Sequence, residues 1–288
     1  LEFLSLAKKH VNNKPYFAYI AFNAPHDPRQ APRAYVDKYP LDRIKMPSNF
    51  LPMYPHKDEI GCKHSLRDEK LGPMPRTEHS VKVHRQEYYA IITHMDEQIG
   101  KILDGLKKSG LEENTYIFFS ADHGLAVGHH GLFGKQNLYE HSTRVPFIIK
   151  GPDIPEGRKV SAPIYLQDIM ATSLAIAEIK KPEHVEFTNI LPLALGKTKK
   201  SPYKEIYGAY LNVQRSITKN NIKLLVYPNV PLIRIFDIAQ DPEEKNDISN
   251  TTIGKKLKLK LFPRLLKLQE QMGDQLDLAK LFPTLTVK

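Results

Sequence analysis

Asp122 and His123 are the residues whose types and spacing most directly suggest chemistry in this sequence. They come just after residues 116–119, an apolar run with the length and composition of a buried strand. In an open α/β sheet, ligands bind in the crevice beyond the carboxyl ends of the strands. A carboxylate and an imidazole delivered there, with Gly124 freeing the turn, predict half of a metal site. A strand-end turn with a capping aspartate is the alternative interpretation.

A lysine follows on the same loop. Lys135 comes after a glycine- and histidine-rich stretch, and the chain then passes through Arg144, Val145 and Pro146 into a second apolar run. A carboxylate, an imidazole and a lysine on one loop suit a doubly charged or oxyanionic substrate held by a cation. The alternative for Lys135 is an exposed loop lysine, which is the usual position of this residue type.

Taken in order, these motifs resemble the formylglycine-dependent sulfatases of the alkaline-phosphatase-like superfamily, in particular the bacterial carbohydrate sulfatases. The segments that carry the resemblance are Ser120-Ala121-Asp122-His123-Gly124, Gly128-His129-His130-Gly131, Lys135 and Arg144-Val145-Pro146. A later segment, Asp241-Pro242-Glu243-Glu244, resembles the signature that closes the small C-terminal subdomain of sulfatases. The resemblance covers nearly the whole chain, and it implies a sulfuric ester hydrolase acting on sulfated carbohydrates or other sulfate esters.

The resemblance implies a role for each matching residue. Asp122 and His123 would ligate a hard cation, Ca²⁺ or Mg²⁺, and Lys135 would lie over a sulfuryl oxygen. His26, at the family's Pro-His position after an early strand, would contact the sulfate or protonate the leaving oxygen. The alternative for His26 is a capping histidine in a proline turn. For His130, which matches the Gly-x-His-Gly histidine, loop support is expected over catalysis, although it also counts as a candidate substrate contact.

A long proline-rich segment, residues 25–75, is expected to wrap the mouth of the site. Arg67 and Arg76 belong to it or follow it directly, and both are candidate substrate contacts. Surface ion pairs that hold an irregular loop are the alternative for each. Glu140 and Arg144 are expected to form a buried ion pair that holds the catalytic loop against the next strand.

The chain lacks part of the family's pattern. Sulfatases make their nucleophile by oxidising a Cys or Ser in a Cys/Ser-x-Pro-x-Arg motif, whereas Cys62 is followed by Lys63 and His64, and no serine has that context. The paired acidic residues and the Lys-x-His segment of family members are also missing. We therefore expect a C-terminal portion of a sulfatase, with formylglycine in a missing N-terminal segment, and we expect this chain alone to be inactive.

The expected fold class is α/β, with a mostly parallel central sheet flanked by helices and a small C-terminal antiparallel sheet with a terminal helix. We expect residues 1–200 to form the C-terminal part of the catalytic domain and residues 201–288 a small α+β subdomain. In the first part we expect a helix up to residue 11, a turn at residues 12–15, a buried strand at residues 16–22, and helices at residues 84–108 and 165–179. In the second we expect strands at residues 205–210, 213–218, 222–227 and 233–238, then a helix from about Ile253 that Pro263 should kink or interrupt.

The charge and hydrophobicity of the sequence limit the kinds of partner and location that can be expected. The net charge of +10, from 42 basic and 32 acidic residues, could favour nucleic acid, an acidic membrane or a sulfated polymer. The charges are scattered, and no motif of nucleic-acid recognition is present, so no nucleic-acid partner is expected. No apolar run approaches the roughly twenty residues of a membrane span. The first residues carry no signal-peptide pattern, and a periplasmic or extracellular location is implied by the resemblance alone.

Two other functions remain open. A phosphodiesterase or phosphonate monoester hydrolase of the same superfamily would share the Asp-His pair and the lysine. A non-catalytic module could instead bind sulfated or phosphorylated polymers through its positive charge. The sequence does not predict the sugar, the position of the sulfate or the oligomeric state.

Overall fold

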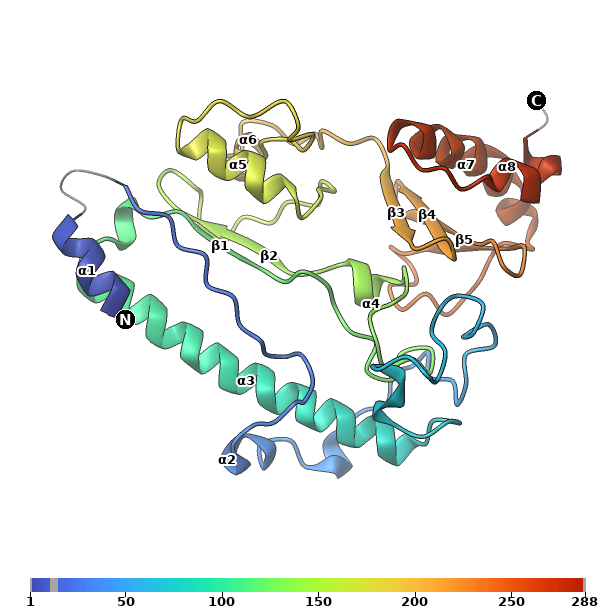
Figure 1. Cartoon of the computed structure of the whole chain (residues 1–288), viewed down its shortest axis with the longest axis horizontal. Coiled ribbons are helices and arrows are strands. Elements are labelled where there is room, and N and C mark those ends of the chain that lie inside the picture. Colours follow the sequence, from blue (N-terminus) through green and yellow to red (C-terminus); the bar gives the residue numbers. More distant parts are fainter. Residues whose placement is uncertain (1, 11–14, 287–288) are drawn as a thin grey trace. The chain divides into compact units, whose positions relative to one another are not determined.

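The computed structural model describes residues 2–10 and 15–286 (Figure 1). The chain divides into two compact units, which are described separately. The first unit comprises Leu1–Met46, Thr77–Phe118 and Ile148–Ile154, and the second comprises Pro47–Arg76, Phe119–Phe147 and Pro155–Lys288. The domain boundary near residue 200 therefore stays a prediction, since these units are interleaved along the chain.

One long helix, α3 (Glu78–Ser109), is the main element of the first unit. The Thr77 side chain accepts a hydrogen bond from the Ser80 amide at its start, and Gly110 ends it with φ at 74°. These caps confirm the predicted helix and extend it by about a turn and a half at the N-terminal end. The short helices α1 (Glu2–His10) and α2 (Arg33–Val36) pack against α3.

Two short strands, β1 (Ile117–Ser120) and β2 (Phe147–Lys150), form a two-stranded sheet. Both lie where the sequence predicts strands. The hydroxyl of Ser120 donates to the carbonyl of Pro146 at 2.8 Å, which joins the end of β1 to the start of β2. The loop that carries the candidate site residues therefore begins and ends at neighbouring points.

The prediction of a buried strand at residues 16–22 was wrong. Residues 15–23 are extended but form no strand, and Phe17 and Tyr19 are 77% and 85% exposed. Ile20 and Phe22 are exposed as well. Such a continuous apolar run is typical of a strand covered on both faces. Within the described residues of the first unit, nothing covers it in this way.

The small antiparallel sheet was predicted correctly. Its strands are β3 (Ile206–Tyr210), β4 (Gln214–Lys219), β5 (Ile222–Tyr227) and β6 (Leu232–Asp237), paired in that order. Every neighbouring pair is antiparallel. Asn220 and Asn221 have φ of 49° and 61°, which is the backbone of a tight two-residue hairpin turn.

The helix α7 (Thr252–Gln271) packs against this sheet and begins with Thr251 capping the Gly254 amide. Pro263 was expected to kink or interrupt this helix. It does not interrupt it, because α7 continues through Pro263, and a kink stays a prediction. The remaining helices of this unit are short: η2 (Glu69–Leu71), α4 (Glu140–Thr143), α5 (Asp168–Ile176), α6 (Leu191–Ala194), α8 (Leu278–Leu281) and η4 (Pro283–Leu285). In the first unit, η1 (Leu41–Arg43) and η3 (Glu112–Asn114) are single 3₁₀ turns.

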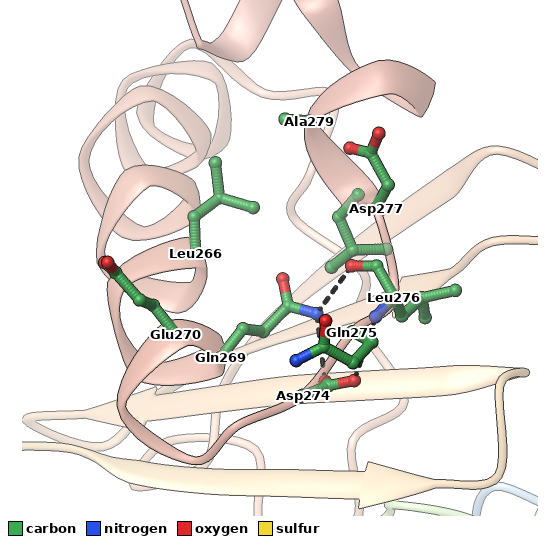
Figure 2. Close-up of a pocket in the computed structure, with 9 residues that line it drawn as sticks. Leu266, Gln269, Glu270, Asp274, Gln275, Leu276, Asp277 and Ala279 are labelled. Carbon is green, nitrogen blue, oxygen red and sulfur yellow. Dashed lines mark hydrogen bonds between the residues drawn. The ribbon is translucent and has the colours of Figure 1, made fainter.

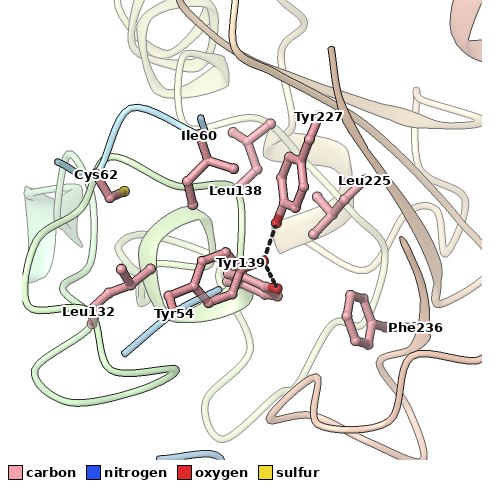
Figure 3. Close-up of a cluster of buried hydrophobic side chains, with 10 residues drawn as sticks. Tyr54, Ile60, Cys62, Leu132, Leu138, Tyr139, Leu225, Tyr227 and Phe236 are labelled. Carbon is pink, nitrogen blue, oxygen red and sulfur yellow. Dashed lines mark hydrogen bonds between the residues drawn. The ribbon is translucent and has the colours of Figure 1, made fainter. Parts of the chain in front are cut away.

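Two apolar clusters cover the two faces of the antiparallel sheet. Leu225 and Tyr227 belong to one cluster, whereas Leu224 and Val226 belong to the other, as the two-residue period of a strand requires. The first cluster contains three tyrosines whose hydroxyls meet, and it also contains Cys62 (Figure 3). Burial raises the pKa of the Cys62 thiol, so this cysteine is a packed core residue and not a reactive nucleophile.

Among the helices that the structure describes, none has the length and apolarity needed to cross a bilayer.

Candidate active site

Asp122 and His123 lie just beyond β1, in the second unit. The His123 amide donates to Asp122 Oδ1 at 3.0 Å, and His123 Nδ1 lies 2.9 Å from the carbonyl oxygen of Gly124. Because a carbonyl only accepts, Nδ1 carries a proton, so in the neutral ring Nε2 is the nitrogen with the lone pair. That Nε2 lies 3.6 Å from Asp122 Oδ2, and the Asp122 side chain is 87% exposed. One oxygen and one nitrogen ligand are thus presented side by side.

Gly124 lies where α4 packs closely against the turn that carries Asp122 and His123. Its amide donates to the Ser142 carbonyl at 2.9 Å. A Cβ at this position would lie 2.0 Å from the His141 carbonyl oxygen, a distance that no side chain tolerates. The glycine is therefore required because α4 passes directly against the turn that carries Asp122 and His123.

Lys135 is held by a buried carboxylate. Its Nζ lies 3.3 Å from Oδ2 of Asp68, and the same oxygen accepts a hydrogen bond of 2.8 Å from Gln136. Arg67 donates to the other oxygen of Asp68 through Nε and Nη2 at 3.0 and 2.9 Å. Burial alone would raise the pKa of Asp68, but the hydrogen bonds from Gln136 and Arg67 and the charge of Lys135 hold it below its ordinary value.

Arg76 and Arg67 have different environments. Arg76 is fully buried, pairs with Glu69, stacks over Phe133, and donates to backbone carbonyls of its own loop and to that of Gly131. It holds the loop together, which is the structural alternative for this residue. Arg67 lies at the surface beside Asp68, so its side chain remains accessible. Substrate contact by either arginine stays a prediction.

His130 is part of the core of the second unit. It stacks on Tyr139 with ring centroids 4.0 Å apart, and its Nε2 lies 3.2 Å from Nδ2 of Asn49. Burial lowers its pKa to about 3, with smaller effects from Arg234 and His129. A neutral, stacked imidazole fits the expected role in loop support, and the geometry offers nothing in favour of substrate contact.

His26 belongs to the first unit, so its position is described only there. Its Nδ1 lies 2.8 Å from the Asp27 carbonyl and 3.5 Å from Oδ1 of Asp27. As in His123, the carbonyl fixes the proton on Nδ1. The proposed contact of His26 with a sulfate group stays a prediction.

Glu140 and Arg144 do not form the buried ion pair expected from the sequence. The Arg144 side chain is 73% exposed, and its closest approach to Glu140 is 3.9 Å. Lys223 takes its place, with Nζ at 2.6 Å from Glu140 and 2.9 Å from Glu244. The expectation was wrong because a lysine from β5, distant in the sequence, reaches the carboxylate first.

The donor set fits part of a cation site. Ca²⁺ takes about six to eight oxygen ligands. Asp122 offers carboxylate oxygens, whereas His123 offers a nitrogen, which suits such a hard cation less well. Within the described part of the chain, no group of three or more His, Cys, Asp or Glu residues is arranged to hold a metal. Metal binding by Asp122 and His123 therefore stays a prediction.

One hollow lies away from these residues, between α7 and α8. It has a volume of about 340 Å³, and Gln269 and Asp274 line it (Figure 2). Asp274 already accepts hydrogen bonds from Arg215, Tyr207 and Gln269, which lower the pKa of its carboxyl. Its polar groups thus fasten the end of α7, and no predicted site residue lies there.

Sequence reasoning missed two residues that shape the site. From the sequence, Asp68 is one charged residue of the proline-rich segment with no assigned partner, and Gln136 carries no signal of its own. The contacts of Asp68 with Lys135 and with Gln136 join segments that are far apart in the chain, and no local sequence pattern indicates such pairs. The signal that could have found Asp68 is the arginine before it, since Arg-Asp in a proline-rich loop predicts an ion pair.

Comparison with known families gives two matches. The sequence model of the family described as sulfatase matches residues 1–179. The model described as N-sulphoglucosamine sulphohydrolase, C-terminal, matches residues 128–271. Together they span the loop between β1 and β2 and the antiparallel sheet.

Individual proteins that resemble this chain include sulfatases, in agreement with the family match. An arylsulfatase of Clostridium perfringens is 29% identical over all of this chain and 61% of its own length. A sulfatase of Formosa agariphila is 28% identical over 80% of this chain and 45% of its own length. The chain thus spans about half the length of the curated relatives it matches.

Solved structures show the fold. A protein solved in complex with its substrate D-glucosamine-2-N,6-O-disulfate superposes with a TM-score of 0.78, at 20% identity, over 95% of this chain and 70% of that one. A phosphonate monoester hydrolase of Agrobacterium radiobacter gives 0.76 at 19% identity, over 94% of this chain and 60% of that one. The architecture is therefore the α/β fold of the alkaline-phosphatase-like superfamily, and the chain belongs to the sulfatase family.

Proposed function

We propose that this chain supplies one side of the active site of a sulfatase that hydrolyses sulfate esters of carbohydrates. The observation that carries the proposal is the pair formed by Asp122 Oδ2 and His123 Nε2, 3.6 Å apart beyond the end of β1. The Gly124 carbonyl fixes the tautomer that leaves Nε2 free to ligate. Lys135 follows on the same loop, within the same unit.

Each residue has a role in this proposal. Asp122 and His123 would hold a hard cation, Ca²⁺ or Mg²⁺, which would supply positive charge beside the sulfuryl oxygens. Lys135 neutralises a further oxygen as a point charge. Asp68 keeps the ammonium group of Lys135 in place through an ion pair of 3.3 Å. His26 donates a proton to the leaving alcohol or binds the sulfate.

We further propose that a segment outside this sequence provides the formylglycine nucleophile and the remaining ligands. Three observations support this. Cys62 is buried in the core, the described residues contain no group of three or more His, Cys, Asp or Glu arranged to hold a metal, and residues 16–22 expose an apolar run that would suit coverage by further strands. By itself, the 288-residue chain should not hydrolyse sulfate esters.

Sulfated carbohydrates are the proposed substrate class, and a periplasmic or extracellular location is the proposed setting. The disulfated glucosamine bound to a structural neighbour, and an ulvan-active sulfatase of Formosa agariphila with 28% identity, support the substrate class. No observation specifies which sugar or which position is desulfated.

The second candidate is a phosphonate monoester hydrolase, because one such enzyme shares the fold almost as closely. A substrate panel separates the two. The longer polypeptide that contains this chain (the full-length parent) would be assayed with sulfated monosaccharides, an aryl sulfate and an aryl phosphonate monoester. The proposal requires the highest kcat/KM on a sulfate ester, and preference for the phosphonate would replace it with the second candidate.

A further inference from the structure

The solvent-facing side of α7 carries a row of positive charges. Lys256, Lys260, Arg264 and Lys267 are separated by four, four and three residues, and such spacings make side chains neighbours along one side of a helix. At a rise of about 1.5 Å per residue, the row is about 16 Å long. Its three lysines are exposed, and the Arg264 side chain is 41% exposed. These four residues are called the cationic row below.

Acidic side chains do not balance the cationic row. Besides its six lysines and arginines, α7 contains one acidic residue, Glu270. The three lysines of the row form no ion pair with any residue that the structure describes. Arg264 pairs with Glu205, but the same carboxylate lies 2.6 Å from Lys219, so one acidic group serves two cations.

The cationic row also opposes the stability of its own helix. Lys256 and Lys260 are four residues apart, as are Lys260 and Arg264, and like charges at this spacing destabilise a helix. An anion placed along the row would remove this repulsion. The arrangement therefore indicates a surface that is completed by a negatively charged partner.

The cationic row is separate from the candidate active site. α7, drawn in red in Figure 1, packs on the face of the antiparallel sheet that carries Leu224 and Val226. Leu138 and Tyr139, from the loop between β1 and β2, pack in the cluster on the other face. A ligand on the row would thus occupy a different surface of the second unit.

The chemistry of the row favours a linear polyanion. Lysine ammonium groups act as point charges, and a line of them matches anionic groups that repeat along a chain. A helix that binds membranes turns a broad apolar face to the lipid, whereas only Ile253 and Leu259 of the large apolar residues in α7 are exposed. Proteins that bind single-stranded nucleic acid stack bases on aromatic side chains, and the one aromatic residue of α7, Phe262, is buried.

We propose that the cationic row binds a sulfated polysaccharide chain at a surface separate from the candidate active site. The sulfate groups of the polymer pair with the exposed lysines, and the neutralised row no longer repels itself. Such a surface holds a polymer on the second unit while another part of the same chain is free to reach the loop between β1 and β2. The choice of a sulfated polymer rests on the proposed function, whereas the binding itself requires no turnover.

The test is a competition experiment on the 288-residue chain, in which the anisotropy of fluorescein-labelled dextran sulfate reports binding. The competitors are unlabelled dextran sulfate, uncharged dextran, an oligothymidylate and phosphatidylglycerol vesicles, compared at equal concentrations of negative charge where they carry one. Dextran sulfate should bind and should be the best competitor, and dextran should not compete. Absence of dextran sulfate binding overturns the proposal. Equal or better competition by the oligothymidylate or the vesicles overturns the choice of partner.

A triple variant locates the surface. Replacing the three lysines of the row (Lys256→Gln, Lys260→Gln and Lys267→Gln) should weaken dextran sulfate binding about tenfold or more. The slope of log affinity against log salt concentration should become shallower by about two to three, because fewer counterions are released. The matched control removes the same charge at three exposed, scattered lysines of the second unit, Lys63→Gln, Lys159→Gln and Lys180→Gln.

The control should change the affinity less than about twofold, since charges away from the polymer are screened by salt. Equal weakening by the two triple variants overturns the proposal. The urea midpoint of the first variant should be no lower than that of the native chain, because the substitutions remove like-charge repulsion. A lower midpoint contradicts the repulsion within the row. Failure of the full-length parent to hydrolyse sulfate esters would refute the proposed function and leave this binding result unchanged.

Discussion

Lys135 Nζ lies 3.3 Å from Oδ2 of Asp68, a carboxylate that is almost wholly buried. Gln136 and Arg67 donate to the same carboxylate, so one acidic group organises three side chains from two distant segments. A flexible four-carbon side chain gains a fixed position in this way. Asp68 is therefore the residue that gives the candidate catalytic lysine its place in the second unit.

Asp68→Asn should destabilise the chain by about 1–3 kcal/mol, because the buried partners lose a charged acceptor. The pKa of Asp68 is lowered in the folded chain, so its contribution is complete above the unfolded value of 3.8 and is lost as pH falls below it. Urea unfolding at pH 7 and at pH 3.5 checks both effects. Between pH 7 and pH 3.5, Asp68→Asn should lose less free energy of unfolding than the native chain. The exposed control Asp104→Asn should lose as much as the native chain. Equal acid sensitivity of the native chain and Asp68→Asn contradicts this account.

Gly124→Ala should disrupt the turn that carries Asp122 and His123. Its Cβ would meet the His141 carbonyl at 2.0 Å, so the backbone must shift, at a cost of about 1–3 kcal/mol. The matched control is Gly100→Ala in α3, where a Cβ meets nothing within 4 Å and helix propensity favours alanine by about 1 kcal/mol. Denaturant midpoints measure both. Similar midpoints for the two variants would show that the close approach is not required.

Arg76→Leu should be the most damaging of these substitutions. It leaves the Glu69 carboxylate buried without its cation, and breaking a buried pair in this way costs about 3–5 kcal/mol. The exposed pair of Arg33 with Asp37 provides the control, since Arg33→Leu should change stability by about 0.5 kcal/mol or less. Unfolding free energies of the two variants, measured side by side, test the contrast. A small loss for Arg76→Leu would mean that its guanidinium is not structural.

His130 and His141 predict sensitivity to mild acid. Burial lowers the pKa of His130 to about 3, and that of His141 lies well below its ordinary value. Both stay neutral in the folded chain while the unfolded chain takes up protons below about pH 6.5. Each histidine therefore lowers the free energy of unfolding as the pH falls below about 6.5. The loss is up to about 1.4 kcal/mol per pH unit and stops at the pKa of the folded chain.

His130→Gln isolates one of these contributions. Between pH 7.5 and pH 5 the native chain should lose about 1 kcal/mol or more relative to this variant. The exposed control His79→Gln should keep the full pH dependence. Parallel pH profiles for the native chain and His130→Gln would contradict the buried, neutral state of His130.

The sequence predicted the elements whose signals are local. The four antiparallel strands follow from a period of two and from turns such as Asn220-Asn221, and α3 follows from its apolar stripe. The position of Asp122 and His123 beyond β1 follows from an apolar run that ends in polar residues. These predictions depend on neighbours in the chain, and the structure confirms them.

Features that depend on distant partners were not predicted. Residues 16–22 have the composition of a buried strand, yet burial requires neighbouring strands that composition does not supply. Glu140 was assigned to Arg144 because they lie one helical turn apart, but Lys223 from β5 approaches more closely. Pro263 was expected to kink or interrupt its helix, yet α7, which packs against the antiparallel sheet, continues through it.

The most direct test of the central claim is the kcat/KM of the full-length parent on a sulfate ester, measured for the native protein and for Asp122→Asn, Lys135→Ala and the control Lys63→Ala. Asp122 and Lys135 should each contribute at least about 2.7 kcal/mol to the transition state, so each substitution should reduce kcat/KM by about a hundredfold or more. Lys63, an exposed lysine in a loop of the second unit, should be replaceable without effect. Near-native turnover in Asp122→Asn, or hydrolysis by the 288-residue chain alone, would contradict the account.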